Sequence, residues 1–290
     1  MKVDIPGPAK GLLFMFMATV VLACMHGMVR YLGADLHPFV IAFYRNLFGL
    51  VAILPLVFRV GMSGMRTHHL RLMVLRSISG LIAMSTWFYG LSRVPTAEAT
   101  ALSFTAAIFT ALAAFIFLGE KMKMRRWTAI IGGFIGVIVV LQPTTDNYNP
   151  YMLLILVSCV FWGLSVTAVK FLTRTDSTTS IVAWMSILLT IMSLPPALFY
   201  WQWPDLSQFL LLGVMGILAT LGHLGMTRAL ALAETTAVMS IDFMRLVWGA
   251  LIGILFFRDA FDIYTWIGAF IIFASGLYII FRESAARENR

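Results

Sequence analysis

Ten long apolar runs, separated by short polar connections, dominate this sequence of 290 residues. A helix needs about 20 consecutive apolar residues to cross a bilayer, and the runs have this length. Charged residues make up only 12% of the chain, against about 25% in a soluble domain. The pattern excludes a water-soluble globule and predicts an all-α integral membrane protein. We expect transmembrane helices at 11–32, 37–58, 70–91, 95–118, 126–141, 151–172, 179–200, 207–232, 236–257 and 262–281.

The distribution of lysine and arginine predicts the orientation of these helices. One set of connections and tails carries nearly all the basic residues, and the opposite set carries only Arg93 and Arg258. Because basic loops stay in the cytoplasm, both termini are expected there, which requires an even number of spans. The formal net charge of +8 is therefore expected to face lipid headgroups rather than nucleic acid. The basic set is Lys2, Lys10, Arg59, Arg66, Arg71, Lys121, Lys123, Arg125, Arg126, Arg174, Arg282, Arg287 and Arg290.

The second half of the chain repeats the first in a nearly constant frame. A shift of 139 residues aligns Trp127 with Trp266, and a shift of 140 aligns the Leu-Pro pair of the second span with that of the seventh. We therefore expect two units of five helices, 11–141 and 151–281. Since each unit holds an odd number of spans, the second is expected to be inverted relative to the first. Inverted repeats are typical of secondary transporters, in which the substrate site lies near the midplane between the halves.

Several short motifs carry a resemblance to a known family. Residues 76–143 contain a helix-opening Arg76, the triplet 103–105 (Ser-Phe-Thr) and the triplet 118–120 (Leu-Gly-Glu), followed by a glycine-containing run after Trp127. This stretch resembles an EamA-type module of the drug/metabolite transporter superfamily. The second half is similar at Phe243-Met244-Arg245-Leu246-Val247-Trp248 and from Gly268 to Glu283, and Phe43-Tyr44-Arg45 resembles the arginine-bearing second span of these proteins.

The resemblance implies two inverted EamA repeats and a site between spans one to four and six to nine, with spans five and ten peripheral. It implies a secondary transporter in the bacterial inner membrane that moves a small organic metabolite by alternating access. The run 103–143 is most similar to carriers for S-adenosylmethionine uptake, so an S-adenosylmethionine-like compound, an amino acid or a vitamin is expected as substrate. Two departures from the family pattern are Ala107, where many relatives have a proline that kinks the helix, and Arg258-Asp259 in place of Gly-Glu.

Two alternatives to a metabolite carrier remain open. One is a multidrug or metabolite exporter of the same fold, and the other is a non-transport integral membrane enzyme. An enzyme would need a nucleophile–base or metal-ligand set, and the sequence contains no HExxH, CxxC or GxxxxGK[ST] motif. We therefore expect no enzyme activity, no cofactor and no metal. A proton or an exchanged counter-metabolite could drive transport, and the protein could be a monomer or a homodimer.

Ionisable residues inside membrane spans are rare and indicate functional positions. Asp242 and Arg245 are three residues apart, so they share a helix face, and Arg76 lies at a similar depth. We predict that Asp242 faces the central cavity, balanced by Arg245 and Arg76; the alternative is a closed salt bridge between the halves. Arg45 is either a structural tie or a clamp for an anionic group. Glu98 is either a first-turn acid favoured by the helix dipole or part of an outer vestibule.

The remaining candidates are aromatic or lie near helix ends. His26 and His223 are either packing residues or proton relays, and His26, Arg45 and Glu98 are the candidates for coupling or gating. Arg30, Lys170 and Arg228 lie near helix ends and are expected to reach lipid headgroups. An aromatic-walled pocket suits planar or cationic ligands, although packing against lipid is the alternative for each ring. The aromatic candidates for substrate binding are Trp87, Tyr89, Phe104, Trp162 and Trp248, in addition to His223.

Overall fold

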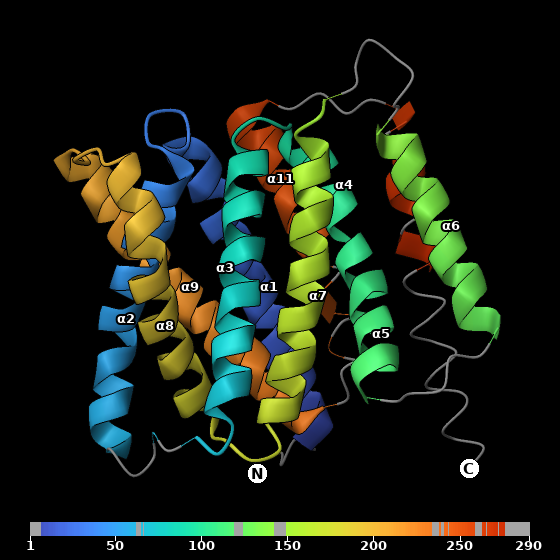
Figure 1. Ribbon diagram of the computed structural model, residues 1–290. Coiled ribbons are helices and arrows are strands. Elements are labelled where there is room, and N and C mark those ends of the chain that lie inside the picture. The colour runs from blue at the N-terminus through green and yellow to red at the C-terminus, as the bar shows by residue number, and fades with distance from the viewer. Residues whose placement is uncertain are drawn as a thin grey trace, which may run out of the picture.

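The computed structural model shows a bundle of α-helices (Figure 1). It describes residues 7–61, 65, 67–118, 124–141, 149–233, 238, 241–242, 244–258, 263–264, 266–271 and 273–275, and every regular element within these ranges is helical. The helices are α1 (Gly7–Leu32), α2 (Pro38–Val60), α3 (Leu70–Leu91), α4 (Thr96–Ser103), α5 (Thr105–Leu118), α6 (Met124–Leu141), α7 (Met152–Leu172), α8 (Thr178–Phe199), α9 (Leu206–Leu232) and α11 (Met244–Phe257).

Six of these helices are long and apolar enough to cross a membrane, namely α1, α2, α3, α7, α8 and α9. The predicted span 70–91 coincides with α3, and the bounds of α2, α7, α8 and α9 differ from the predicted spans by no more than two residues. The ninth and tenth predicted spans are described in part, as α11 and as helical residues between 263 and 275. The length and position of the apolar runs therefore predicted the helices correctly.

Local capping residues explain where several helices begin. The His37 side chain accepts a hydrogen bond from Phe39 N at 3.3 Å, and Pro38 occupies the first turn of α2, where a missing N–H is tolerated. Asp205 and Gln208 form a reciprocal capping box at the start of α9. These contacts satisfy backbone donors that the first turn of a helix leaves unpaired.

The fourth predicted span, 95–118, is interrupted by a turn at Phe104 that separates α4 from α5. No proline lies between positions 96 and 118, so the interruption has another cause. The Thr105 hydroxyl donates to Leu102 O at 2.8 Å, and the Cys159 thiol of α7 approaches the carbonyl oxygens of Leu102 and Ser103 at 3.6 and 3.8 Å. Side-chain donors that compete for helix carbonyls bend and weaken the backbone ladder. We attribute the interruption to these bonds.

Helix contacts are symmetric under exchange of the two halves of the chain. α1 packs along α9, and α3 packs along α7, which is the equivalent pair when the first five spans are swapped with the second five. α2 packs along its counterpart α8, and the fourth and ninth spans meet through α4 and α11. The halves therefore interlock rather than lying side by side as separate bundles.

The fifth predicted span, α6, lies at the edge of the bundle (Figure 1). Its glycine face packs against the last described helical residues. A Cβ added at Gly132 would lie 2.8 Å from Ser275 Oγ, and one added at Gly268 would lie 2.7 Å from Gly136 O. The GxxxG motif of α6 is therefore used for close packing within the chain.

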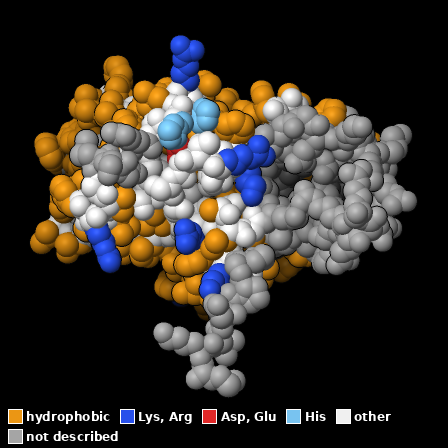
Figure 2. Space-filling model, turned by 90° about the horizontal axis from the view of Figure 1, so that it is seen from below, with side chains coloured by type: hydrophobic (Ala, Val, Ile, Leu, Met, Phe, Trp, Pro, Cys, Tyr) orange, Lys and Arg blue, Asp and Glu red, His pale blue; other side chains and the backbone are white. Residues whose placement is uncertain are grey.

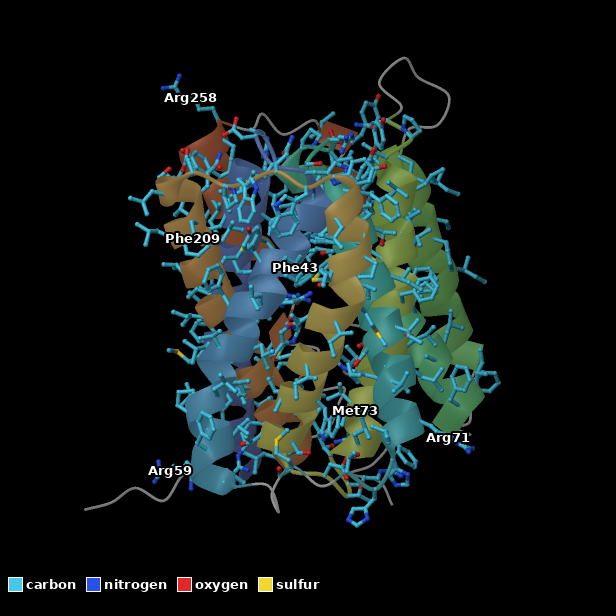
Figure 3. All side chains as sticks on the ribbon, turned by 60° about the vertical axis from the view of Figure 1, so that its left-hand side comes forward. Phe43, Arg59, Arg71, Met73, Phe209 and Arg258 are labelled. Atoms are coloured by element: carbon cyan, nitrogen blue, oxygen red, sulfur yellow. The ribbon has the colours of Figure 1, made fainter. Side chains whose placement is uncertain are left out.

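The two ends of the bundle differ in charge. The N-terminus of α1 and the C-terminus of α9 lie at one end, where Gly11 contacts Ala233. Figure 2 shows this end with several basic side chains, and Figure 3 shows Arg59 and Arg71 at this end and Arg258 at the other. We call it the basic face; its members include Lys10, Arg59, Arg71 and Arg174.

Lys170 has a role in the fold that the sequence did not indicate. Instead of extending to lipid headgroups, its ammonium group donates to Leu230 O at 2.8 Å and to Ala233 O at 3.1 Å. These carbonyls belong to the C-terminal end of α9, where a positive charge is favoured by the helix dipole. Lys170 therefore fastens α7 to the end of α9.

Arg258 follows α11 and has a left-handed backbone conformation, with φ of 54°. A left-handed residue with a Cβ costs about 1–2 kcal/mol, and glycine adopts this conformation without that cost but loses about 0.5–1 kcal/mol in chain entropy. We expect Arg258→Gly to stabilise the protein by about 0.5–1 kcal/mol, measured as a raised melting temperature in detergent. Arg258→Ala is the matched control because it removes the same charge without relieving the backbone. Equal effects of the two substitutions would contradict the argument.

Candidate functional site

A cavity with a volume of about 110 Å³ lies in the centre of the bundle. Residues of α1 to α5, of α7 to α9 and of α11 line it, so both halves of the chain contribute to its wall. The cavity thus lies among spans one to four and six to nine. Its polar and aromatic lining consists of His26, Arg45, Arg76, Trp87, Phe88, Ser103, Ser158, Cys159, Trp162, Ser165, His223 and Arg245.

Helix periodicity explains which residues of α7 reach the cavity. Ser158, Trp162 and Ser165 are separated by four and three residues and therefore share one helix face. The Ser158 hydroxyl donates to Ala83 O of α3 at 2.8 Å. On α3, Arg76, Gly80 and the residues after them repeat with the same spacing. The facing surfaces of α3 and α7 therefore form one wall of the cavity.

Arg45 is held by three side chains that surround it. Its Nη1 donates to Asn46 Oδ1 at 2.7 Å and contacts Met84 Sδ at 3.3 Å, and its Nη2 lies 2.9 Å from His223 Nε2. Asn46 in turn donates to Ser193 Oγ at 3.2 Å. These bonds join α2 to α3, α8 and α9. The geometry matches the structural tie that was one of the two roles predicted for Arg45.

The contact between Arg45 and His223 also defines the state of the histidine. A guanidinium group can only donate hydrogen bonds, so His223 Nε2 must accept. A histidine that accepts at Nε2 is neutral and carries its proton on Nδ1. In this conformation His223 is therefore a partner of Arg45 and not a charged residue of the cavity wall.

We expect Arg45→Lys to destabilise the protein by about 1–3 kcal/mol, because lysine keeps the charge but cannot reach both Asn46 and His223. The loss would leave buried polar groups without partners. It can be measured as a lower melting temperature of the purified protein. Arg59→Lys is the matched control, since Arg59 lies exposed on the same helix. A melting temperature for Arg45→Lys equal to that of the control would disprove the structural role.

Asp242 and Arg245 form an ion pair, as their spacing predicted. The Arg245 guanidinium also lies over the Trp162 ring, 5.8 Å from its centre. Arg245 lines the cavity, whereas Asp242 lies behind it and is not part of the lining. One carboxylate oxygen of Asp242, Oδ1, is buried and has no hydrogen-bond partner within the residues that the structure describes. Asp242 therefore does not line the cavity itself, but it neutralises the charge of Arg245, which does.

Arg76 and Trp87 present unpaired donors in the lining. Arg76 is 5% exposed, and its Nε and Nη1 atoms have no hydrogen-bond partner among the described residues. Trp87 Nε1 is also buried without a partner in this part of the chain, and the Trp87 ring packs at 5.3 Å from the ring of His26. Within the described residues of the lining, three arginines face two histidines and no carboxylate. The cavity is therefore positively charged and partly aromatic.

Besides Asp242, four of the predicted site residues lie outside the cavity lining. Tyr89 packs under Arg93, whose guanidinium carbon is 3.8 Å from the ring centre, at the end of the bundle opposite the basic face. Phe104 is buried against the ring of Phe273. Trp248 donates to Thr19 Oγ1 at 3.3 Å between α11 and α1. Glu98 is in the first turn of α4, and none of these four residues lines the cavity.

Several residues of the cavity were not predicted from the sequence. Ser103, Ser158, Cys159 and Ser165 are small and neither charged nor aromatic, so they do not stand out in an apolar run. Gly80 was missed for the same reason. The signal that could have identified most of them is the spacing of Ser158 and Ser165 around Trp162, a conspicuous residue of the same helix.

Known proteins resemble this chain along nearly its whole length. The model of the EamA-like transporter family matches residues 9–142 and 149–282. An S-adenosylmethionine uptake transporter of Rickettsia bellii is 31% identical over 264 residues, which cover 91% of this chain and 90% of that protein. A riboflavin transporter of Brucella anthropi is 32% identical over 255 residues, covering 84% and 88%. The pseudopaline exporter CntI of Pseudomonas aeruginosa is 24% identical over 270 residues, covering 91% and 93%.

Proposed function

The chain belongs to the EamA-like transporter family, and we therefore propose that it moves a small organic metabolite across the membrane by alternating access. It is a multi-pass transporter of the bacterial inner membrane. The observation that carries the proposal is the buried central cavity, because both halves of the chain line it and it contains polar and aromatic side chains. Such a cavity is the arrangement expected of a substrate site between two repeats.

Under this proposal the two units, 11–141 and 151–281, are inverted repeats with both termini in the cytoplasm. The helix directions support it. Gly33 after α1 contacts Ser92 after α3, and Asn149 before α7 donates to Arg93 O at 2.9 Å. The end of α1 thus lies at the same face as the start of α7, its counterpart in the second unit. The concentration of arginine and lysine on the basic face supports a cytoplasmic orientation for that face.

The proposed site consists of lining residues that are cationic or aromatic. Arg76 and Arg245 would orient a charged substrate, with Asp242 acting on Arg245, while Trp87 and Trp162 would contact its planar part. An S-adenosylmethionine-like compound, an amino acid or a vitamin fits this combination of groups. His26 and His223 border the site. The relatives named for S-adenosylmethionine and riboflavin support these substrate classes.

Uptake into proteoliposomes tests the proposal directly. Purified protein would be reconstituted and supplied with labelled S-adenosylmethionine, riboflavin or single amino acids, with and without a pH gradient or a preloaded counter-substrate. We expect saturable uptake of one class, stimulated either by the gradient or by preloading. Stimulation by the gradient would assign proton coupling, and stimulation by preloading would assign exchange. Uptake no higher than in protein-free liposomes under all conditions would refute the proposal.

Export is the second candidate, favoured by the similarity to the pseudopaline exporter. Direction is distinguished by comparing right-side-out and inverted membrane vesicles from cells that produce the protein. An importer driven by an inward proton gradient accumulates substrate in right-side-out vesicles, whereas a proton-driven exporter accumulates it in inverted vesicles. The same labelled compounds serve in both preparations.

A further inference from the structure

We infer that the cavity binds the carboxylate group of its substrate at Arg76, and that an amino-acid-type metabolite is therefore transported. The inference rests on the proposed function and makes the substrate class more specific. Its basis is a comparison of the three arginines that line the cavity, Arg45, Arg76 and Arg245. They lie in one low-dielectric space but differ in how their guanidinium donors are engaged.

Two of the three arginines have partners within the protein. Arg45 uses Nη1 and Nη2 for contacts with Asn46, Met84 and His223, and only its Nε lacks a partner among the described residues. Arg245 is paired with Asp242 and also lies over Trp162. Their geometry is fixed by the fold, so neither guanidinium needs a ligand to hold it in place.

Arg76 differs because its guanidinium has no side-chain partner in the described part of the chain. Its side chain is buried, it forms no ion pair with a described residue, and its Nε and Nη1 donors are unpaired. Met73, one turn earlier on α3, is fully buried as well. An unpaired buried cation is strongly unfavourable, and an anionic substrate would remove this cost.

The space beside Arg76 is suited to a small anion. A Cβ added at Gly80 would lie 3.7 Å from Arg76 Nη1 and 3.8 Å from Ser165 Oγ, so the absence of a side chain at Gly80 leaves a gap next to both groups. Ser165 supplies a hydroxyl that can donate to an anion. The fork of the guanidinium matches the two oxygens of a carboxylate.

The number of available donors favours a carboxylate over a phosphate ester. Arg76 offers one fork of free donors, which one carboxylate fills. A phosphate monoester carries about 1.5 to 2 negative charges at pH 7 and would need a second cation with free terminal donors. Arg245 is neutralised by Asp242, and Arg45 keeps its charge but has both terminal nitrogens engaged by Asn46, Met84 and His223.

Ligand pairs that differ only in the anionic group test the inference. Binding to the purified protein would be measured by calorimetry for S-adenosylmethionine and its decarboxylated form, for methionine and methioninamide, and for riboflavin 5′-phosphate and riboflavin. We expect the carboxylated member of the first or second pair to bind at least tenfold more tightly. Equal binding within both of these pairs, no binding by any carboxylated compound, or discrimination confined to the phosphate pair would overturn the inference.

Three variants connect the discrimination to Arg76. Arg76→Met should reduce the ratio of the affinities for the carboxylated and uncarboxylated ligands from tenfold to about one. Gly80→Ala should also reduce this ratio, because the added methyl group fills the gap without a clash that would unfold the protein. Arg71→Met is the matched control, because Arg71 lies exposed on the same helix, and it should leave the ratio unchanged. A ratio that persists in Arg76→Met would overturn the inference.

A second readout separates substrate binding from a purely structural role. If Arg76 is an unpaired buried cation, Arg76→Met should keep or raise the melting temperature of the ligand-free protein, because an apolar side chain of similar length fits an apolar wall. A lower melting temperature than that of Arg71→Met would show that Arg76 stabilises the fold, contrary to the inference. The proteoliposome result is independent of this binding result. If the protein transports a compound but binds ligands with and without a carboxylate equally, the carboxylate site alone is refuted. If it prefers the carboxylated ligands but transports nothing, the proposed function alone is refuted.

Discussion

Replacement of Asp242 by asparagine should reduce transport roughly ten- to hundredfold. The substitution preserves size but removes the negative charge that pairs with Arg245. A hydrogen bond to a charged group contributes about 1.5–3 kcal/mol, and each 1.4 kcal/mol is about a factor of ten in an equilibrium constant. Arg245 would then be free to leave Trp162 and to add an uncompensated charge to a cavity that already holds Arg45 and Arg76. The expected loss is measured as the initial uptake rate of the transported compound in proteoliposomes.

Asp35→Asn is the control for this experiment, because Asp35 is exposed in the connection after α1 and does not border the central cavity. It should transport at the wild-type rate. The melting temperatures of both variants would be compared with wild type to detect a general folding defect. Wild-type uptake by Asp242→Asn, with unchanged affinity and pH response, would show that Asp242 has no part in transport.

Replacement of Gly216 by alanine should strongly destabilise the packing of α9 against α2. The two helices approach so closely at this point that an added Cβ would overlap Phe48 Cβ and lie 2.8 Å from Gly49 N. Overpacking of a dense core costs typically 1–3 kcal/mol, and contact with backbone puts this position at the upper limit, about 3 kcal/mol. One turn further on, Thr220 Oγ1 donates to Gly49 O at 2.9 Å, which holds the two helices at this distance.

Gly213→Ala is the matched control for Gly216→Ala. It lies on the same helix, and its added Cβ would be 4.0 Å from the ring of Phe48, an ordinary contact. We expect a melting temperature about 6–12 °C lower for Gly216→Ala and one close to wild type for Gly213→Ala. Similar melting temperatures for the two variants would indicate that α2 and α9 can separate without loss of stability.

Most of the fold could be predicted from the sequence because the signal for a membrane helix is strong. A run of apolar residues has few alternatives in a bilayer, and Pro38 and Asp205 mark helix starts. The interruption at Phe104 could not be predicted in this way. It depends on Cys159, which comes from another helix and contacts the carbonyls of Leu102 and Ser103 only in the folded protein.

Part of the candidate site could also be predicted from the sequence. Buried arginines such as Arg76 and Arg245 are conspicuous in apolar runs, whereas the small residues beside them are not. Trp87 and Tyr89 were both predicted to bind substrate, although two positions on a helix are about 200° apart and only Trp87 lines the cavity. Helices that are apolar on all sides have no preferred face in the sequence. The partner of each charged group, such as His223 for Arg45, requires the tertiary structure.

The positions of the two cysteines allow thiol labelling to detect on which side of the membrane the cavity is open. Cys24 is exposed on the outside of the bundle, whereas Cys159 lines the cavity and is 3% exposed. In a Cys24→Ser background, a membrane-impermeant maleimide can therefore reach a thiol only by entering from the aqueous phase. The rate of labelling from each side of sealed vesicles would then measure how often each entrance opens, without any engineered label in the cavity.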